Sequence, residues 1–291
     1  MKNTNLKKLS GNIESTISAY NKSVYSYSEL SGMLRENKSG WGLPESLTAK
    51  AFISLLTDIV DFREIQIELP YRNETRYVFG DLSVYELAVS LKPRAYLTHF
   101  TAMHLHGLTD QIPKTVYLNY EQSPKRKPKG NLRQDLVDRA FKRDIKRTKN
   151  KAKCEGFTIH VINGMHTGRR GVIKTVGAKG EILNTTNVER TLIDITVRPE
   201  YSGGPYEVIK AYRLAYDKVS VNALAAMLKK LDYVYPFHQA IGYYLQRAGV
   251  YRDSQIALLR KFEMHYDFYL AHNMTETDYS SEWRLYFPKD F

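Results

Sequence analysis

The stretch SLTAKAFISLLTDIV, residues 46–60, is followed by EIQIEL at residues 64–69 and by TRYVFG at residues 75–80. In the first stretch, apolar residues recur at helical spacing from Leu47 to Ile59, which predicts an amphipathic helix. EIQIEL alternates polar and apolar residues, and TRYVFG returns after the polar turn PYRNE, which predicts a two-stranded hairpin. We therefore expect the N-terminal region to contain a helix that is followed directly by a two-stranded ribbon.

Two further helices are expected before this stretch. One covers about residues 5–20, and the other follows Ser26, where SYSE can form a capping box with Glu29. Three helices followed by a ribbon are typical of a winged helix-turn-helix, whose third helix lies in the DNA major groove. We therefore expect a DNA-binding domain over residues 1–82. Small helical domains of this kind also bind proteins, so a protein-binding adaptor is an alternative.

The predicted DNA surface combines small polar and basic side chains of the third helix with arginines of the hairpin. The helix residues should read bases, and the hairpin arginines should hold phosphates. The candidates on and just before the helix are Ser46, Thr48, Lys50 and Ser54. The candidates on the hairpin are Arg72 and Arg76.

Positive charge is concentrated in one segment. The chain has 43 Lys and Arg against 31 Asp and Glu, a net charge of +12, and residues 122–153 alone hold 13 basic and 3 acidic residues. Such a segment predicts a polyanionic partner, usually nucleic acid, although a charged loop can also serve only solubility. It could extend the DNA contact or bind RNA. The cluster expected to clamp phosphates is Lys125, Arg126, Lys127 and Lys129.

Residues 83–291 are expected to form a larger mixed α/β domain, which makes the whole protein α+β. Two helices are predicted over 83–107, a basic helix over 132–151, and a helix capped by Thr186 with Glu189. Further helices are predicted at 205–217, 220–232 and 236–248. Strands are predicted at 115–120, 157–162 and 171–176, with closing strands in DFYLAH and SEWRLYF.

Three histidines, His99, His104 and His106, lie within eight residues. A helical zinc pair needs histidines at positions i and i+4, usually as HExxH, and none of these spacings matches. Walker, GxGxxG and GxSxG motifs are also missing from the sequence. We therefore expect no metal, no cofactor and no catalytic residue, and an Arg190–Asp194 helix pair that is structural.

An enzyme is nevertheless the main alternative from another class. In that hypothesis a nuclease or nucleic-acid-modifying enzyme uses the winged helix for targeting. Its active-site candidates are Glu189, Asp194 and the three histidines. Such an enzyme would lose turnover in a chelator, whereas a repressor would still bind DNA.

The sequence also indicates a cellular compartment. The one cysteine, Cys154, has no partner for an internal disulfide, which fits a reducing cytoplasm. The N-terminus has no apolar segment typical of a signal peptide. No apolar run approaches the roughly 20 residues of a membrane span. We therefore expect a soluble cytoplasmic protein without a membrane partner.

Two long strings carry a family resemblance: HFTAMHLHGLTDQIPKTVYLN at residues 99–119 and TNVERTLIDITVRPEYSGG at residues 186–204. With HQAIGYYLQRAG and EWRLYFP further on, the chain resembles the AbiEi antitoxins of phage-defence systems that act by abortive infection. The resemblance implies an N-terminal winged helix that represses its own operon by binding double-stranded promoter DNA. It also implies a C-terminal antitoxin domain of a type IV toxin–antitoxin system. That domain would counteract a nucleotidyltransferase-like toxin without a stable complex, and the histidines would have no metal or catalytic role.

Overall fold

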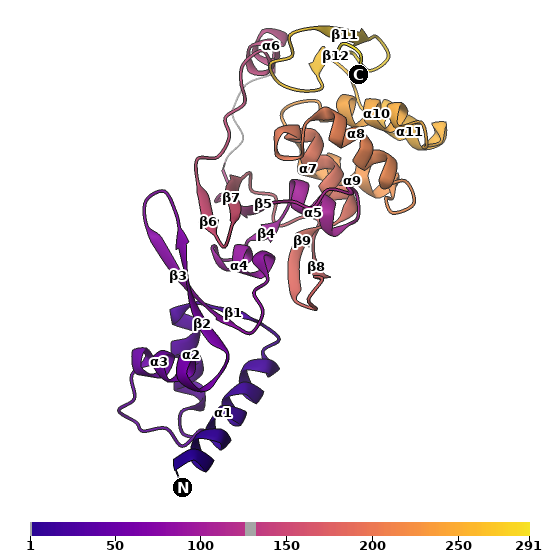
Figure 1. The fold of residues 1–291 in the computed structure, drawn as a ribbon. Coiled ribbons are helices and arrows are strands. Elements are labelled where there is room, and N and C mark those ends of the chain that lie inside the picture. Colours follow the sequence, from indigo (N-terminus) through magenta and orange to yellow (C-terminus); the bar gives the residue numbers. More distant parts are fainter. Residues whose placement is uncertain (1, 126–131) are drawn as a thin grey trace.

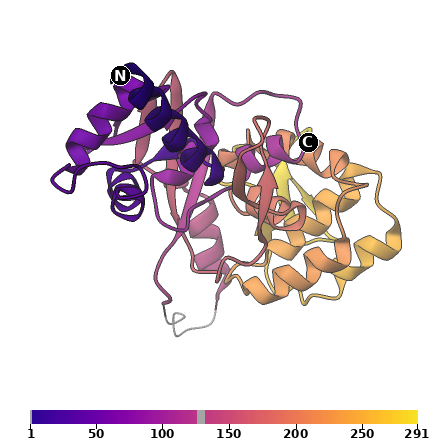
Figure 2. The ribbon, with the colours of Figure 1, turned by 90° about the horizontal axis from the view of Figure 1, so that it is seen from below.

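The computed structural model describes residues 2–125 and 132–291, with the backbone alone for residues 2–6. It shows a mixed α/β protein in which a long curled sheet connects a helical N-terminal region with a helical C-terminal region (Figure 1). Seen from below, the N-terminal helices and the C-terminal helices lie on opposite sides of the sheet's middle strands (Figure 2). Each helix that the structure describes is too short or too polar to traverse a lipid bilayer.

The N-terminal region contains the three predicted helices and the predicted hairpin, with one additional short strand between the first two helices. Its helices are α1 (Lys2–Ala19), α2 (Tyr27–Asn37) and α3 (Ala49–Ile59), and its strands are β1 (Val24–Tyr25), β2 (Phe62–Glu68) and β3 (Asn73–Phe79). The capping box that SYSE predicts is confirmed, because Ser26 accepts from the Glu29 amide and Glu29 accepts from the Ser26 amide. The three helices pack on the ribbon through one buried cluster, which includes Ile13, Ile17, Leu30, Phe52 and Leu56.

Nine strands form the large sheet in the order β1-β3-β2-β6-β7-β5-β4-β9-β8. Its further strands are β4 (Tyr96–Leu97), β5 (Thr115–Glu121), β6 (Lys151–Cys154), β7 (Phe157–Gly164), β8 (Val172–Val176) and β9 (Ile182–Thr186). Strands β5 and β7 are parallel along their length, so their carboxyl ends meet at one edge of the sheet. Strands β2 and β6 are joined through a single residue pair, Glu68 with Lys153. The sheet thus continues across the domain boundary predicted near residue 82.

The remaining helices cover the sheet and build the C-terminal core. They are α4 (Val84–Ser90), α5 (His99–Leu105), α6 (Gln134–Phe141), α7 (Val188–Val197), α8 (Pro205–Leu214), α9 (Val221–Leu231), α10 (Phe237–Ala248) and α11 (Asp253–Arg260), with the short 3₁₀ helix η1 (Pro199–Tyr201). A small second sheet consists of β10 (Phe268–Tyr269), β11 (Thr277–Ser280) and β12 (Leu285–Pro288). Trp283, fully buried, packs against Gly242 of α10, where the missing side chain leaves room for the indole.

Three sequence predictions for this region need correction. The second of the two helices expected over 83–107 begins only at His99, because Tyr96–Leu97 form a strand that pairs with β5 and β9. The basic helix expected over 132–151 ends at Phe141. After that residue the sequence KRDIKRTKNK offers one apolar side chain, Ile145, so no apolar stripe is available to bury a helix face.

The third correction concerns the cap of α7. Asn187, not Thr186, is the N-cap, and its side chain accepts a hydrogen bond from the Arg190 amide at 2.9 Å. Thr186 belongs to strand β9. Glu189 does not return to the cap, since its carboxylate accepts from the Ser220 amide at the start of α9.

Candidate nucleic-acid interface and adjoining pocket

The predicted base-reading residues lie on the exposed side of α3 or just before its first residue. Ser46, Thr48, Lys50 and Ser54 are all exposed, whereas Phe52 and Leu56 on the opposite face are buried. Thr48 is the N-cap of the helix, and its hydroxyl accepts from the Ala51 amide at 3.2 Å. Thr48 therefore has a structural task, while Lys50 and Ser54, one turn apart, present their side chains to the exterior.

The two hairpin arginines have different environments. Arg72 is exposed next to the ribbon tip and pairs with Glu74, at 2.5 Å between Nη2 and Oε1. Arg76 is buried, and its guanidinium donates to the Ser90 hydroxyl and carbonyl and to Glu74. Because these hydrogen bonds hold the Arg76 guanidinium inside the protein, the expectation that Arg76 holds a phosphate does not fit the structure. Tyr71, 92% exposed, lies at the tip itself.

The predicted phosphate-clamping cluster lies largely beyond what the structure describes. Lys125 is described and exposed in the loop after β5, whereas Arg126, Lys127 and Lys129 fall outside the described residues. The rest of the basic segment is described, however. We call residues 142–153 the basic strap.

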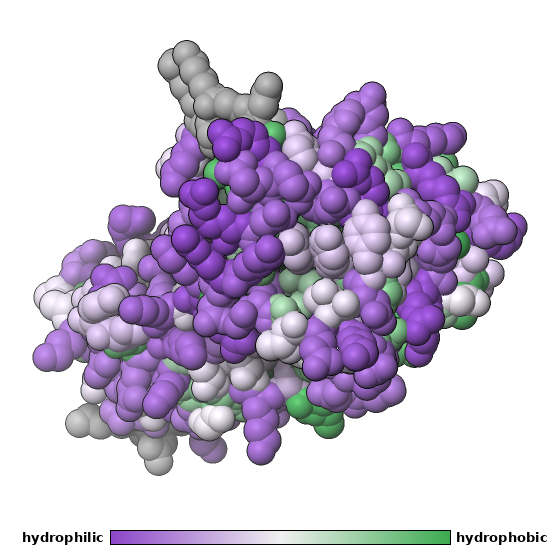
Figure 3. All heavy atoms as spheres, turned by 90° about the horizontal axis from the view of Figure 1, so that it is seen from above, coloured by the Kyte–Doolittle hydropathy of each residue, from purple (hydrophilic) through white to green (hydrophobic). Residues whose placement is uncertain are grey.

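The basic strap carries a row of exposed cations on an anchored backbone. Thr148 fixes it, because its amide donates to the Tyr201 hydroxyl at 2.7 Å and its hydroxyl donates to the Val161 carbonyl at 3.0 Å. None of the strap cations forms an ion pair with any carboxylate in the described parts of the chain. These cations are Lys142, Arg143, Lys146, Arg147, Lys149, Lys151 and Lys153. Hydrophilic side chains gather on the face shown in Figure 3.

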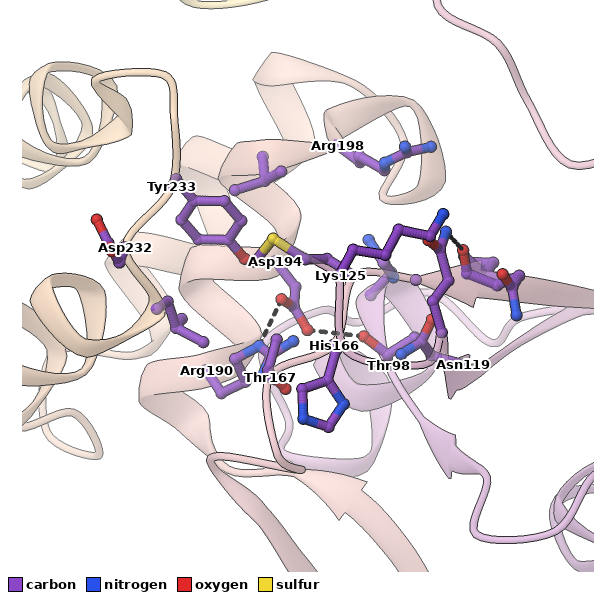
Figure 4. A pocket seen from close by; sticks show the side chains of 18 of the residues that line it. Thr98, Asn119, Lys125, His166, Thr167, Arg190, Asp194, Arg198, Asp232 and Tyr233 are labelled. Carbon is purple, nitrogen blue, oxygen red and sulfur yellow. Dashed lines mark hydrogen bonds and ion pairs between the residues drawn. The ribbon is translucent and has the colours of Figure 1, made fainter. Parts of the chain in front are cut away.

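A pocket of about 440 Å³ opens at the carboxyl ends of β5 and β7. Strand ends supply Asn119 and Asn163, helix α7 supplies Arg190 and Asp194, and the loop after α9 supplies Tyr233 (Figure 4). The carboxyl ends of parallel strands are a recurrent place for ligand sites in α/β sheets. The pocket is therefore a candidate site for a small ligand group.

The floor of the pocket is a buried ion pair. Arg190 Nε lies 2.6 Å from Asp194 Oδ1, one turn along α7, and both side chains are less than a tenth exposed. Asp194 Oδ2 accepts from the Thr98 hydroxyl at 2.9 Å, and Arg190 Nη1 donates to the Arg170 carbonyl at 2.8 Å. Burial works against the charged form of Arg190, but Asp194 together with Tyr233 and Tyr96 raises the pKa of the guanidinium above its ordinary value. The contacts thus support the structural interpretation of this pair.

The three histidines of the first family string, residues 99–119, do not meet at a common site. His99 is buried, packs edge-on against Tyr201 and lines the pocket, and burial lowers its pKa to about 4. His106 places Nε2 2.5 Å from the Thr186 carbonyl oxygen, and Gly107 ends the helix with a φ of +62°. Within residues 2–125 and 132–291, no three His, Cys, Asp or Glu side chains are arranged to hold a metal ion.

The sequence missed several pocket residues. Arg198 and Tyr233 line the pocket but carried no recognisable motif of their own. His166 also lines it and lies 3.4 Å from Glu121. The available signal was indirect, because Arg198 belongs to the second family string and Lys125 to the basic segment.

Comparisons with known proteins bear on the fold. Neither the protein-family models nor the curated proteins include a match to this chain. Among solved structures, it is similar to the crystal structure of the RV2827C protein from Mycobacterium tuberculosis, with a TM-score of 0.55 and 16% sequence identity. The match covers 96% of this chain and 91% of that one. At this identity the likeness shows a shared fold over nearly the whole chain.

Proposed function

We propose that the protein is a DNA-binding transcriptional autorepressor and the antitoxin of a type IV toxin–antitoxin system. The DNA-binding part of this proposal rests on the arrangement of helix α3. This helix buries Phe52 and Leu56 against its neighbours, presents Lys50 and Ser54 outward, and is followed directly by the β2–β3 ribbon. That order and exposure suit a winged helix-turn-helix over residues 1–82, with α3 in the major groove.

The basic strap provides a second observation that supports DNA binding. Its seven exposed cations, which form no ion pair among the described residues, can neutralise phosphates, and such contacts supply affinity without sequence choice. In this proposal α3 reads promoter sequence, while the strap and Arg72 hold the backbone of the double-stranded DNA.

The antitoxin part of the proposal rests on the resemblance to the AbiEi antitoxins. In the structure the two strings that carry it form one packed unit. Thr98, next to the first string, bonds Asp194 of the second, and His106 of the first contacts Thr186 of the second. This joint packing supports treating residues 83–291 as the part that counteracts a nucleotidyltransferase-like toxin in the cytoplasm.

The first experiment measures binding of the full-length protein to its own promoter DNA and to scrambled DNA, across a range of salt concentrations. A Lys50→Ala, Ser54→Ala double variant should lose about tenfold or more of its preference for the promoter, since a base contact contributes roughly 1–3 kcal/mol of discrimination. Lys8→Ala on α1, also exposed, is the matched control and should keep the preference. Equal binding of promoter and scrambled DNA by the wild-type protein would contradict the repressor proposal.

Two further measurements address the remaining parts. Promoter binding should persist in a chelator, whereas chelator-sensitive turnover of a nucleic acid would favour the enzyme hypothesis with Glu189 and Asp194. Co-expression with a nucleotidyltransferase-like toxin encoded beside it should restore growth. Continued growth arrest in the presence of the folded protein would contradict the antitoxin role.

A further inference from the structure

At one end of the pocket between β5, β7 and α7, two cations have no ion-pair partner among the described residues. Arg190 on the floor is neutralised by Asp194, but Lys125 and Arg198 in the wall form no ion pair with a carboxylate in the described parts of the chain. The contact found for the Arg198 guanidinium is with the Tyr201 ring, at 5.8 Å. A cavity wall with two such cations favours an anionic ligand group.

The opposite end of the pocket has a different character. Figure 4 shows the ring of Tyr233 across the pocket from the Arg198 guanidinium, with Asp232 beyond it. Leu231 and Val197 add apolar lining. An aromatic face suits stacking with a flat ring, and such stacking tolerates any nucleobase.

The pocket also adjoins the basic strap. Tyr201, whose ring contacts Arg198, accepts the hydrogen bond from the Thr148 amide of the strap. The exposed Arg147 and Lys149 flank Thr148, so the strap is joined to the pocket residue Arg198 through Tyr201. A chain of phosphates could run along the strap and end in the pocket.

One buried polar atom in the wall also lacks a partner. His99 is 6% exposed and lines the pocket, and its Nδ1 has no hydrogen-bond partner among the described residues. An unpaired buried nitrogen costs stability unless something satisfies it. His99 is thus a lining residue of the pocket with a hydrogen-bonding atom that the described residues leave unsatisfied.

We propose that this pocket binds a nucleoside phosphate, with Arg198 and Lys125 at the phosphate and Tyr233 against the base. The ligand is either a free nucleotide or the terminal nucleotide of a single strand, since both present the same chemistry. This inference goes beyond the repressor and antitoxin proposal and does not depend on α3. A Lys50→Ala, Ser54→Ala protein should therefore bind the ligand like the wild type.

The test measures binding of ATP, CTP, GTP and UTP to the full-length protein by calorimetry. A linear single-stranded oligonucleotide with a terminal phosphate and its circular form of the same sequence are titrated in parallel. Lys125→Gln and Arg198→Gln should each weaken binding by about tenfold or more, as expected for a lost charged hydrogen bond. Lys261→Gln, an exposed lysine outside the pocket, should leave it unchanged.

Tyr233 provides a second pair of variants. Tyr233→Phe keeps the aromatic face and should bind like the wild type, whereas Tyr233→Leu should weaken binding because stacking is lost. Unfolding midpoints of all variants show whether each protein is folded.

The two ligand sources give different results. Variant-sensitive binding of free nucleotides assigns the pocket to them, and variant-sensitive binding of the linear strand but not of the circle assigns it to a strand end. If none of these ligands binds, or if they bind the folded Lys125→Gln, Arg198→Gln and Tyr233→Leu proteins as tightly as the wild type, the proposal is overturned.

Discussion

Glu86 of α4 accepts hydrogen bonds from both the amide and the hydroxyl of Ser23, a residue 63 positions earlier in the chain. The distances are 2.8 Å from the Ser23 nitrogen to Oε1 and 2.6 Å from the Ser23 oxygen to Oε2. The same carboxylate also accepts from the Val24 amide at 3.2 Å. One buried side chain thus ties the start of α4 to the entry into strand β1.

The first prediction follows from these bonds. Glu86→Ala leaves the Val24 amide buried without its acceptor, so we expect the free energy of unfolding to fall by about 2 kcal/mol. Urea denaturation measures the change. Glu64→Ala, an exposed glutamate on β2, is the matched control and should change stability by less than about 0.5 kcal/mol. Equal effects of the two changes would contradict the assigned role of Glu86.

The second prediction compares two glycines in helices. A Cβ added to Gly242 would lie 2.1 Å from the Trp283 ring, whereas one added to Gly32 of α2 would meet nothing within 4 Å. Gly242→Ala should therefore destabilise the protein by roughly 1–3 kcal/mol or more through overpacking. Gly32→Ala should stabilise it by about 0.5–1 kcal/mol, because alanine is the better helix former. Thermal unfolding should therefore show a lower midpoint for Gly242→Ala and a higher midpoint for Gly32→Ala than for the wild type.

The third prediction concerns pH. Burial lowers the pKa of His99 from its ordinary value of 6.5 to about 4, and burial lowers those of His160 and His238 in the same way. The unfolded chain therefore binds protons more readily than the folded chain does over this interval. The stability from neutral histidines is fully present above pH 6.5 and is lost as the pH falls towards 4.

We expect His99→Asn to make the free energy of unfolding less dependent on pH between 6.5 and 4. Asparagine suits this position because the backbone has a φ of +51°, which asparagine tolerates. Parallel curves for wild type and His99→Asn would show that His99 makes no such contribution.

The fourth prediction tests the basic strap through salt dependence. Changing Lys146, Arg147 and Lys149 to glutamine should reduce the slope of log affinity for duplex DNA against log salt by about 2–3, since each lost phosphate contact removes close to one unit. A second triple variant, with glutamine at Lys229, Lys230 and Lys261, changes the net charge equally at exposed positions elsewhere. If both triple variants alter the slope alike, net charge rather than the strap governs the affinity.

Local signals in the sequence were sufficient for many helix ends. The cap of α2 at Ser26, the cap of α9 at Ser220 and the left-handed end of α10 at Gly249 are each made within one helical turn. Such signals depend on neighbours in the chain, so a sequence displays them directly. The mixed α/β character followed from the same elements. The strands β6 and β9 and the helix α11, by contrast, were not predicted.

Long-range contacts account for what the sequence could not show. Arg76 has the sequence position of a hairpin arginine but is buried, because Ser90 of α4 supplies its acceptors from outside the hairpin. The pocket likewise assembles Asn119, Arg190 and Tyr233 from three separate segments. The spacing and periodicity of residues along the chain do not predict which distant segments pack together.

The single pair between Glu68 and Lys153 has a mechanical consequence. Because β2 and β6 share one residue pair, backbone hydrogen bonds contribute little to holding the N-terminal ribbon on the central sheet. One buried cluster spans the joint instead, with Ile65 and Ile67 of β2 packed together with Leu87 of α4 and Ile159 of β7. Side-chain packing, more than strand pairing, therefore joins the two regions into one body.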